Sequence, residues 1–369
     1  MVSVIFDSNE ITNLFTSLAK IEGLSGNEKN VADFIKNFLK QFNLSVYEDD
    51  AKRIDGGNSG NLICQVNGGG DFVLLSHMDT ARSTKNLKPI IENGKIKSDE
   101  TTILGADNRA GITAILYALK KSFENGRPQK SFTITFTICE ETTLSGSKNL
   151  MLDENIKMGF VFDSHLDPGN FIIKSPGAMM FKIEIKGKPA HAGIEPEKGI
   201  NAIECAAKAI ANIKQGRIDE ETTLNFGKIN GGEATNVVPH YVVIEGEIRS
   251  FDESKVNKQF ETLREKFLSE AKLCGCSVEF EAHWDFKPYQ INPDWEVYKK
   301  IKESIEAIGL EAKEAISFGG SDANSLNAKG IHTVNIGIGA KNPHSNQEYV
   351  LIEHLIQASK IAYWLMNYE

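Results

Sequence analysis

The sequence predicts an α/β protein built from two domains, one of them inserted into the other. The chain has 369 residues, which exceeds the size at which a single hydrophobic core usually stops growing. Helical and strand-like apolar patterns alternate near both ends of the chain. Between them lies a separate compact series of strands and helices, so we expect one domain to be discontinuous.

The first part of the discontinuous domain, residues 1–175, begins as an α/β unit. Its apolar spacing predicts helices over residues 9–20 and 28–41 and strands over 44–47, 61–66, 72–76 and 131–139. A further helix opens at Asp107, where either Asp107 or Asn108 is a suitable cap. The α/β pattern resumes over residues 285–369, with predicted helices at 295–308 and 351–364 and strands at 312–316 and 332–337.

The inserted domain, residues 176–284, has a different order of elements. The pattern predicts strands at 178–186, 222–229, 242–250 and 277–284 and helices at 200–213 and 253–273. This βαββαβ order is the ferredoxin-like arrangement, which covers one face of an antiparallel sheet with both helices. We therefore expect a self-contained domain that acts as a lid.

Composition excludes several classes of partner. The 41 basic and 50 acidic residues give a formal charge of -9, and no basic stripe suited to nucleic acid is present. No apolar run is long enough to span a membrane, and the first residues lack the basic and apolar regions of a signal peptide. We expect a cytoplasmic protein that binds neither nucleic acid nor membranes.

The five cysteines, an odd number spread widely along the chain, favour reduced thiols over a disulfide framework. The closest pair, Cys274 and Cys276, lacks a second pair of ligands at the spacing of a structural zinc site. We therefore expect these thiols to be structural.

Acidic residues and histidines follow several of the predicted strands. His77 and Asp79 follow one strand, Glu140 and Glu141 a second, and Asp163 a third. The carboxyl ends of strands in an open α/β sheet form the ligand crevice, so these groups are expected to meet there. Two loop residues, Asp107 and His344, are placed to reach the same crevice.

This mixture of imidazoles and carboxylates suits zinc, cobalt or manganese, whereas calcium prefers oxygen ligands alone. A bridging carboxylate can hold two cations about 3.5–4 Å apart, where they activate water for hydrolysis. One carboxylate must then remain free to accept a proton. Glu140 and Glu141 can divide these tasks, although their spacing does not assign them. Taken singly, each motif is also compatible with an ordinary surface or core pair.

Together these motifs resemble one family of enzymes. The segments around His77 and Asp79, Asp107, Glu140 and Glu141, and His344 match in order and spacing the metallopeptidases that include peptidase T, aminoacylase and glutamate carboxypeptidase. The resemblance covers essentially the whole chain. It implies a zinc-exopeptidase-type mixed sheet flanked by helices, with the inserted domain serving as both lid and dimerisation domain.

The resemblance also implies roles for the site residues, with two zinc ions in each subunit, replaceable by cobalt or manganese. His77 and Asp163 would hold one ion, Glu141 and His344 the other, and Asp107 would bridge them. Glu140 becomes the general base. Asp79 would orient the His77 ring from the side that faces away from the metal.

In the inserted domain, His191, Asn236 and Arg249 resemble substrate and transition-state contacts of the family. The resemblance implies a homodimer through this domain, in which His191 reaches the active site of the other subunit and stabilises an oxyanion. Arg249 is suited to bind a peptide carboxylate through two hydrogen bonds. Each residue can also be read as an ordinary loop or surface-strand side chain.

Gly319 and Gly320 belong to a glycine-rich segment before a helix, where backbone amides can receive a substrate carboxylate. The alternative for this segment is a tight turn capped by Asp322. At another position the chain departs from the family, because Asn108 and Arg109 follow Asp107 where many relatives have an acid and a lysine. The remaining histidines match no ligand position and are expected to be structural, namely His165, His240, His283, His332 and His354.

The sequence therefore predicts a metal-dependent exopeptidase that acts on short peptides, most specifically an aminotripeptidase. A dipeptidase, a carboxypeptidase and an N-acyl amino acid hydrolase are alternatives on the same scaffold. A metal-binding scaffold protein without activity is a more remote alternative, because such a protein has no need of a free carboxylate at Glu140 beside a complete set of ligands.

Overall fold

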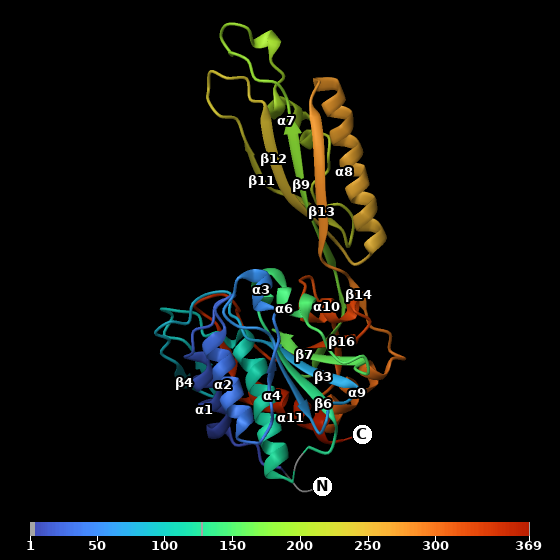
Figure 1. The fold of residues 1–369 in the computed structure, drawn as a ribbon. Helices are drawn as coiled ribbons and strands as arrows, with labels where there is room; N and C mark the ends of the chain where they lie inside the picture. The colour runs from blue at the N-terminus through green and yellow to red at the C-terminus, as the bar shows by residue number, and fades with distance from the viewer. Residues whose placement is uncertain (1–3, 127, 369) are drawn as a thin grey trace. The chain divides into compact units, whose positions relative to one another are not determined.

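A computed structural model describes residues 4–126 and 128–368. Residues 1–3, part of the segment in which the sequence shows no signal-peptide pattern, lie outside the described part. The chain divides into two compact units (Figure 1). The larger unit, here called the catalytic unit, contains the residues up to Lys174 together with Gln290–Ser317 and the residues from Ser321 onward. The second unit contains Ser175–Tyr289 and Phe318–Gly320, where the sequence predicted residues 176–284.

The main sheet is mixed and has nine strands in the order β1-β2-β6-β3-β7-β16-β8-β14, with β15 paired to β8. Its strands β3, β6, β7 and β16 form the parallel centre, and β1 and β2 run antiparallel at one edge. The strands are β1 (Tyr47–Glu48), β2 (Leu62–Val66), β3 (Phe72–His77), β6 (Phe132–Thr137), β7 (Met158–Ser164), β8 (Asn170–Ser175), β14 (Tyr289–Gln290), β15 (Lys313–Ile316) and β16 (His332–Gly337).

Helices cover this sheet. Helix α4 packs on β3 and β7, α1 and α11 lie against α4, and α9 and α10 contact β7 and β16. The helices are α1 (Ser8–Ala19), α2 (Lys29–Lys40), α3 (Lys52–Asp55), α4 (Ala106–Glu124), α5 (Glu140–Thr143), α6 (Ser145–Asn149), α9 (Glu296–Ala307), α10 (Asp322–Ala328) and α11 (Ile352–Asn367). Every residue of β3 and β6 is buried, as expected for parallel strands that are covered on both faces.

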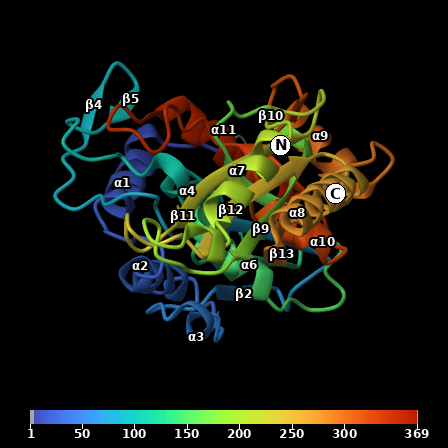
Figure 2. The same cartoon turned by 90° about the horizontal axis from the view of Figure 1, so that it is seen from above.

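The catalytic unit also contains a separate three-stranded sheet. It contains β4 (Ile90–Glu92), β5 (Lys95–Lys97) and β17 (Tyr349–Leu351). The β4–β5 hairpin lies at the margin of the catalytic unit in both views (Figures 1 and 2). The apolar pattern predicted neither these strands nor β8. The strands of the small sheet have only three residues each, too few for a period to stand out, and the buried positions of β8 do not alternate.

Two predicted strands are shorter in the structure. The strand predicted over 44–47 is reduced to Tyr47–Glu48, because only these two residues pair with β2. Asn43 has a positive φ of 56° and the Leu44 amide still bonds to Leu39, so the chain has not yet joined the sheet. The strand predicted to end at Cys139 ends at Thr137.

The second unit has the predicted ferredoxin-like topology. Its sheet has the order β10-β11-β12-β9-β13, and every pair is antiparallel. Leu263 and Phe267 of one helix join Ile183 and Ile244 of the sheet in its core. The elements are β9 (Gly177–Lys186), η1 (Pro196–Lys198), α7 (Ala202–Ala211), β10 (Gly216–Arg217), β11 (Thr223–Gly231), β12 (Tyr241–Ser250), α8 (Glu253–Cys274) and β13 (Ser277–Phe286).

The five cysteines all lie within the described residues, and none of them forms a disulfide. Cys64, Cys139 and Cys205 are buried, whereas Cys274 and Cys276 are partly exposed. Among the described residues, no helix has both the length and the apolar character needed to cross a membrane.

A carboxylate at the sheet edge couples the stability of the catalytic unit to pH. Glu48 pairs with Lys36 and Lys52 and accepts a hydrogen bond from the Gly60 amide at 3.0 Å. Burial alone would raise the pKa of Glu48, but the Lys36 and Gly60 hydrogen bonds outweigh it and lower this pKa from 4.5 to about 2.

Because the folded state has the lower pKa, the stabilisation by Glu48 is complete above about pH 4.5 and is lost as the pH falls towards 2. We expect the free energy of unfolding of Glu48→Gln to fall less between pH 4.5 and pH 2 than that of the unsubstituted protein. Urea unfolding midpoints of both proteins at several pH values would show it. If the urea midpoints of the two proteins changed with pH in parallel, the expectation would be wrong.

Candidate metal centre

His77 occupies the end of β3, in the buried centre of the parallel strands. Its Nε2 atom lies 3.1 Å from Oδ1 of Asp107 and 3.1 Å from Oδ1 of Asp163. Its Nδ1 atom lies 3.3 Å from Oδ1 of Asp79. The ring is therefore held on one side by Asp79, while Nε2 faces two further carboxylates.

Asp107 stands between two histidines. Its Oδ1 faces His77, and its Oδ2 lies 3.4 Å from Nε2 of His344. Asp107 and Asn108 have non-helical backbone angles at the start of α4, and the peptide bond between them is cis. Asn108 caps the regular helix beyond them, since its Oδ1 accepts a hydrogen bond from the Gly111 amide at 3.0 Å. Of the two caps considered, the structure selects Asn108.

Asp163 lies within β7, one residue before the end of the strand. The sequence analysis had placed it after the strand. Its Oδ1 accepts a hydrogen bond from Nδ2 of Asn108 at 3.0 Å, and Nδ2 of Asn108 also donates to the Phe162 carbonyl at 2.8 Å. Asn108 therefore has a structural role, because its side-chain amide ties α4 to β7 and orients Asp163.

Gly111 permits this close approach of α4 and β7. A Cβ atom at Gly111 would lie 2.0 Å from the Phe162 carbonyl oxygen and 2.3 Å from Oδ1 of Asn108. We expect Gly111→Ala to destabilise the protein by about 1–3 kcal/mol or more and to weaken metal binding, because it forces Asn108 and Asp163 apart. Thermal unfolding and metal titration would measure both effects.

Gly227→Ala is the control for this prediction, because the nearest atom to its added Cβ is 3.5 Å away. This control should behave like the unsubstituted protein. An unchanged melting temperature in Gly111→Ala would show that α4 and β7 do not constrain one another here.

Glu140 and Glu141 form the first turn of α5, directly after Cys139, which has a positive φ of 51°. Glu141 faces His344, with 3.0 Å between Oε2 and Nε2. The Glu140 carboxylate points toward His77, and its Oε2 lies 4.0 Å from Nε2. Two adjacent acids thus face different histidines.

The charges within the cluster raise the pKa values of its two histidines and lower that of Asp107. Burial disfavours the charged form of His77, but Asp163, Asp107 and Asp79 outweigh it and raise the pKa of the imidazole well above its usual value. Burial likewise opposes ionisation of Asp107, yet hydrogen bonds from His344 and His77 hold its pKa well below the usual range. The hydrogen bond that His344 donates to Asp107, followed by the one it donates to Glu141, raises the pKa of His344 to about 10.

Glu140 behaves differently from these residues. Burial raises its pKa well above the usual value, and the neighbouring charge of Asp163 adds to this effect. Its side chain is only 12% exposed. A carboxylate with this environment has a strong tendency to take up a proton, which is the property of a general base.

The donor set fits divalent cations. One ligand atom each from His77, Asp107 and Glu141 lie within 4.8 Å of one another. The two oxygens of Asp107 face separate imidazoles, so each can serve a different cation. The structure thus brings together seven of the predicted residues, namely His77, Asp79, Asp107, Glu140, Glu141, Asp163 and His344.

One further residue, Glu348, anchors this centre and was not predicted from the sequence. Glu348 is fully buried, and its carboxylate accepts hydrogen bonds from the Gly105 amide at 2.6 Å and the Asp107 amide at 3.0 Å. It follows His344 by four residues in a loop, so no local periodicity marks it.

The other predicted residues belong to the second unit. His191 pairs as an isolated bridge with Val237, and the Asn236 carbonyl accepts a hydrogen bond from the Ala192 amide at 2.9 Å. Arg249 lies in β12 opposite Ala178, at the other end of the sheet, and its Nη2 donates to Glu247 at 3.0 Å. The ten-residue strand β9 separates these two groups by roughly 30 Å.

Gly319 and Gly320 also belong to the second unit. The Gly319 carbonyl accepts a hydrogen bond from Ser175 Oγ at 2.9 Å, and a Cβ at Gly320 would lie 2.6 Å from the Phe286 ring.

The helix after these glycines is capped by Ser321, which forms a capping box with Asn324. The proposed cap Asp322 is therefore wrong. Asp322 is buried instead, with its carboxylate 2.5 Å from the Thr137 hydroxyl.

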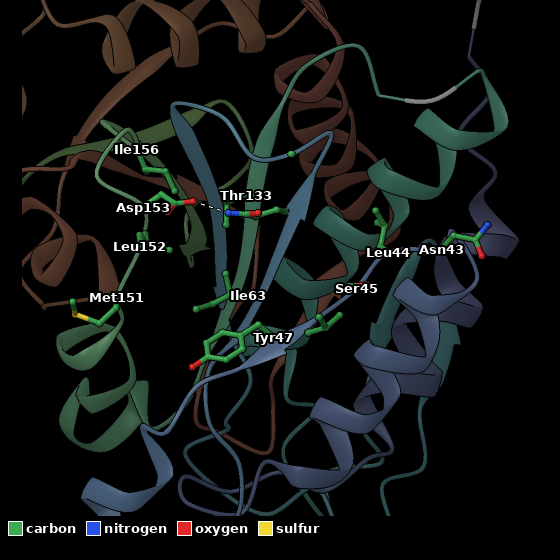
Figure 3. A pocket seen from close by; sticks show the side chains of 13 residues that line it. Asn43, Leu44, Ser45, Tyr47, Ile63, Thr133, Met151, Leu152, Asp153 and Ile156 are labelled. Atoms are coloured by element: carbon green, nitrogen blue, oxygen red, sulfur yellow. Dashed lines mark hydrogen bonds between the residues drawn. The ribbon is translucent and has the colours of Figure 1, made fainter.

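A cavity of about 880 Å³ lies elsewhere in the catalytic unit, beside β1 and β2 (Figure 3). Apolar side chains such as Ile63 and Leu152 line it, and its one acid, Asp153, accepts a hydrogen bond from Gln65 at 2.6 Å. The described residues that line it include no histidine, no cysteine and no second carboxylate. The chemistry therefore points to the metal centre and not to this cavity.

The fold and the donor set define a metallopeptidase, and comparison with known proteins agrees. Residues 61–181 match the model of peptidase family M28, and residues 173–273 match the M20 peptidase dimerisation domain. The chain is 33% identical to the crystal structure of aminopeptidase PepT from Bacillus cereus, with a TM-score of 0.88 and 98% of each chain covered. The structure of a tripeptidase from Staphylococcus aureus is 34% identical, with a TM-score of 0.89 and the same coverage.

The uncharacterized protein YqjE of Bacillus subtilis is 35% identical over 353 residues, covering 94% of this chain and 95% of that protein. These similarities extend over nearly the whole length. The chain belongs to the peptidase T-like M20 metallopeptidases.

Proposed function

We propose that this protein is a cytoplasmic two-zinc aminotripeptidase that removes single residues from short peptides. The observation that carries this proposal is the position of Asp107, whose two oxygens face His77 and His344 separately. A carboxylate in this arrangement is suited to bridge two cations. Cobalt and manganese are expected to substitute for zinc, because the donors are imidazoles and carboxylates.

The remaining donors fall into two groups around Asp107. His77 and Asp163 are proposed to hold one cation, since Oδ1 of Asp163 lies 3.1 Å from Nε2 of His77. Glu141 and His344 are proposed to hold the other. Asp79 leaves Nε2 of His77 available by occupying the Nδ1 side of the ring, as carboxylates behind metal-binding histidines do.

Glu140 is proposed as the general base. When bound, the two cations supply Lewis acidity that polarises the scissile carbonyl and makes a water molecule more acidic. The Glu140 carboxylate accepts the proton of that water and then passes it to the nitrogen of the leaving amine. Its raised pKa helps the first step, and the restored carboxylate is ready for the next substrate.

The preference for tripeptides rests on similarity to the relatives. One solved structure at 34% identity is named a tripeptidase, and another at 33% identity is named an aminopeptidase. The distance between His191 and Arg249 along the second unit favours a homodimer, in which the two residues serve different active sites. In this arrangement Arg249 binds a substrate carboxylate and His191 stabilises the oxyanion in the other subunit.

The test is hydrolysis of an unblocked tripeptide by zinc- or cobalt-loaded protein, beside the same peptide with an acetylated amino group. We expect release of the N-terminal residue from the free peptide and at least about a 10²-fold lower kcat/KM for the blocked one, because a site built to bind an amine rejects an analogue that cannot replace its contacts.

Preferential cleavage of the blocked substrate would instead indicate an aminoacylase or carboxypeptidase. Cleavage of dipeptides alone would indicate a dipeptidase. If the metal-loaded protein cleaved no small amide, a scaffold role without catalysis would replace the proposal.

A further inference from the structure

Two buried carboxylates hold the turn that carries Glu140 and Glu141. Oδ1 of Asp79 accepts a hydrogen bond from the Glu140 amide at 3.0 Å, and Oδ2 accepts one from the Glu141 amide at 3.1 Å. Oε1 of Glu28 accepts a hydrogen bond from the amide of the preceding residue, Cys139, at 3.1 Å. Three successive amides of the turn are thus bound by two acids.

Glu28 has no exposed surface and lies directly before α2. Its Oε1 also accepts the Gly26 amide at 2.8 Å, while Oε2 is buried with no hydrogen-bond partner among the described residues. Since a buried acid without a role costs free energy, its retention here calls for a contact that an apolar residue cannot make. Glu28 makes two such contacts, one with the Gly26 amide in its own loop and one with the Cys139 amide, and only the second reaches the turn that carries Glu140 and Glu141.

Cys139 needs such a contact. It adopts a left-handed backbone conformation, with φ at 51°, which costs a residue other than glycine roughly 1–2 kcal/mol. The left-handed residue turns the chain sharply, so that Glu140 and Glu141 point back over the strand ends. Asp79 binds the two amides after this residue but not the amide of Cys139 itself.

A buried cation offsets the charge of these acids. Arg109 is fully buried, and its Nη1 donates to the Met78 carbonyl at 2.5 Å, between His77 and Asp79. The charges of Asp79, Glu28 and Glu348 all act on its guanidinium. The forked guanidinium has a second nitrogen, Nη2, which donates to the Ile21 carbonyl at 3.3 Å.

We propose that Glu28 is a positioning residue for the metal centre, acting through the amide of Cys139 to hold the turn that presents Glu140 and Glu141. The inference rests on the roles proposed above for these two glutamates. Glu28 contributes an acceptor oxygen at the end of a side chain of a particular length. Glutamine has the same length and an acceptor oxygen, so it should replace Glu28. An apolar side chain of similar size has no acceptor and should fail to replace it.

The experiment compares Glu28→Gln, Glu28→Met and Glu28→Asp with the unsubstituted protein. The readouts are cobalt and zinc affinity by chelator competition, kcat and KM on a tripeptide, and thermal unfolding of the metal-free protein. We expect Glu28→Met to weaken binding of one cation by about 10–100-fold and to lower kcat by a similar factor, with little change in KM. Glu28→Gln should stay within about 3-fold of the original values, since it keeps the acceptor.

Glu48→Met is the matched control, because Glu48 also accepts a backbone amide and pairs with lysine, but none of its partners belongs to the metal centre. It should lose stability without losing cation affinity. If Glu28→Met does not fold, Glu28→Asp takes its place, because Asp keeps the charge but is one methylene shorter. The proposal then requires the Glu28→Asp protein to bind the cation less tightly than the Glu28→Gln protein.

The proposal would be overturned by Glu28→Met binding both cations and turning over as the original protein does, or by Glu28→Gln losing as much as Glu28→Met. Failure of the proposed function has a different signature, since the unsubstituted protein would then fail to cleave peptides. Cation affinity and hydrogen exchange at the Cys139 amide still test the role of Glu28 in that case.

Discussion

Glu140→Gln is expected to lower kcat by about 10²- to 10⁴-fold while the protein keeps its full metal content. The glutamine has the same shape but cannot accept the proton of the attacking water. The structure explains why binding should survive. The Glu140 carboxylate lies 4.0 Å from Nε2 of His77, farther than the carboxylates of Asp107 and Asp163, and its backbone amide remains available to Asp79.

The measurement is steady-state hydrolysis of a tripeptide, with metal content determined by elemental analysis of the same samples. Glu154→Gln provides the same chemical change at an exposed position of the catalytic unit and should leave kcat unaltered. Loss of metal from Glu140→Gln would assign this residue to the ligands. If Glu140→Gln retained most of the activity, Glu140 would not be the general base.

Asp107→Ala is expected to abolish activity and to weaken both cation sites. The substitution removes both oxygens that face His77 and His344, so each site loses a donor at once. Since a complete set of protein ligands supplies about 10–16 kcal/mol to zinc, losing one donor in each set should weaken each site by on the order of 10²-fold or more.

Metal titration should therefore show two weakened sites in Asp107→Ala, whereas His344→Ala should weaken one. Asp153→Ala, in the separate cavity beside β2, is the control and should bind both cations normally. If Asp107→Ala weakened only one site, the proposed bridging role would be wrong. Removal of metal by a chelator should mimic the loss of activity, and added zinc or cobalt should restore it.

Much of the candidate site could be predicted from the sequence. His77, Glu140 and Asp163 are found where buried apolar strands end or nearly end, and parallel strands bring such positions to one edge of a sheet. The βαββαβ pattern of the second unit was equally clear, because its strands and helices are long enough for their periods to be distinguished. The family resemblance then assigned separate roles to Glu140 and Glu141, which spacing alone had left open.

The helix caps show the limit of local patterns. Asp107 and Asn108 are both good caps by composition, yet only Asn108 accepts the helix amide, because Asp107 is directed to the two histidines. Ser321 caps α10 in place of Asp322 for a similar reason, since Asp322 is drawn to Thr137. In each case a contact distant in the sequence decides between two residues that are locally equivalent.

The sequence by itself determined the order of the longer elements, the two-unit organisation expected for this length and the residue types of a metal-dependent hydrolase. Only the tertiary structure decided how the centre is supported. Glu28, Arg109 and Glu348 lie far apart in the chain and no period or spacing links them, yet all three are buried and hold backbone groups of the segments that present the ligands. Periodicity and spacing report interactions along the chain, whereas the hydrogen bonds of these buried charges depend on which segments the fold brings together.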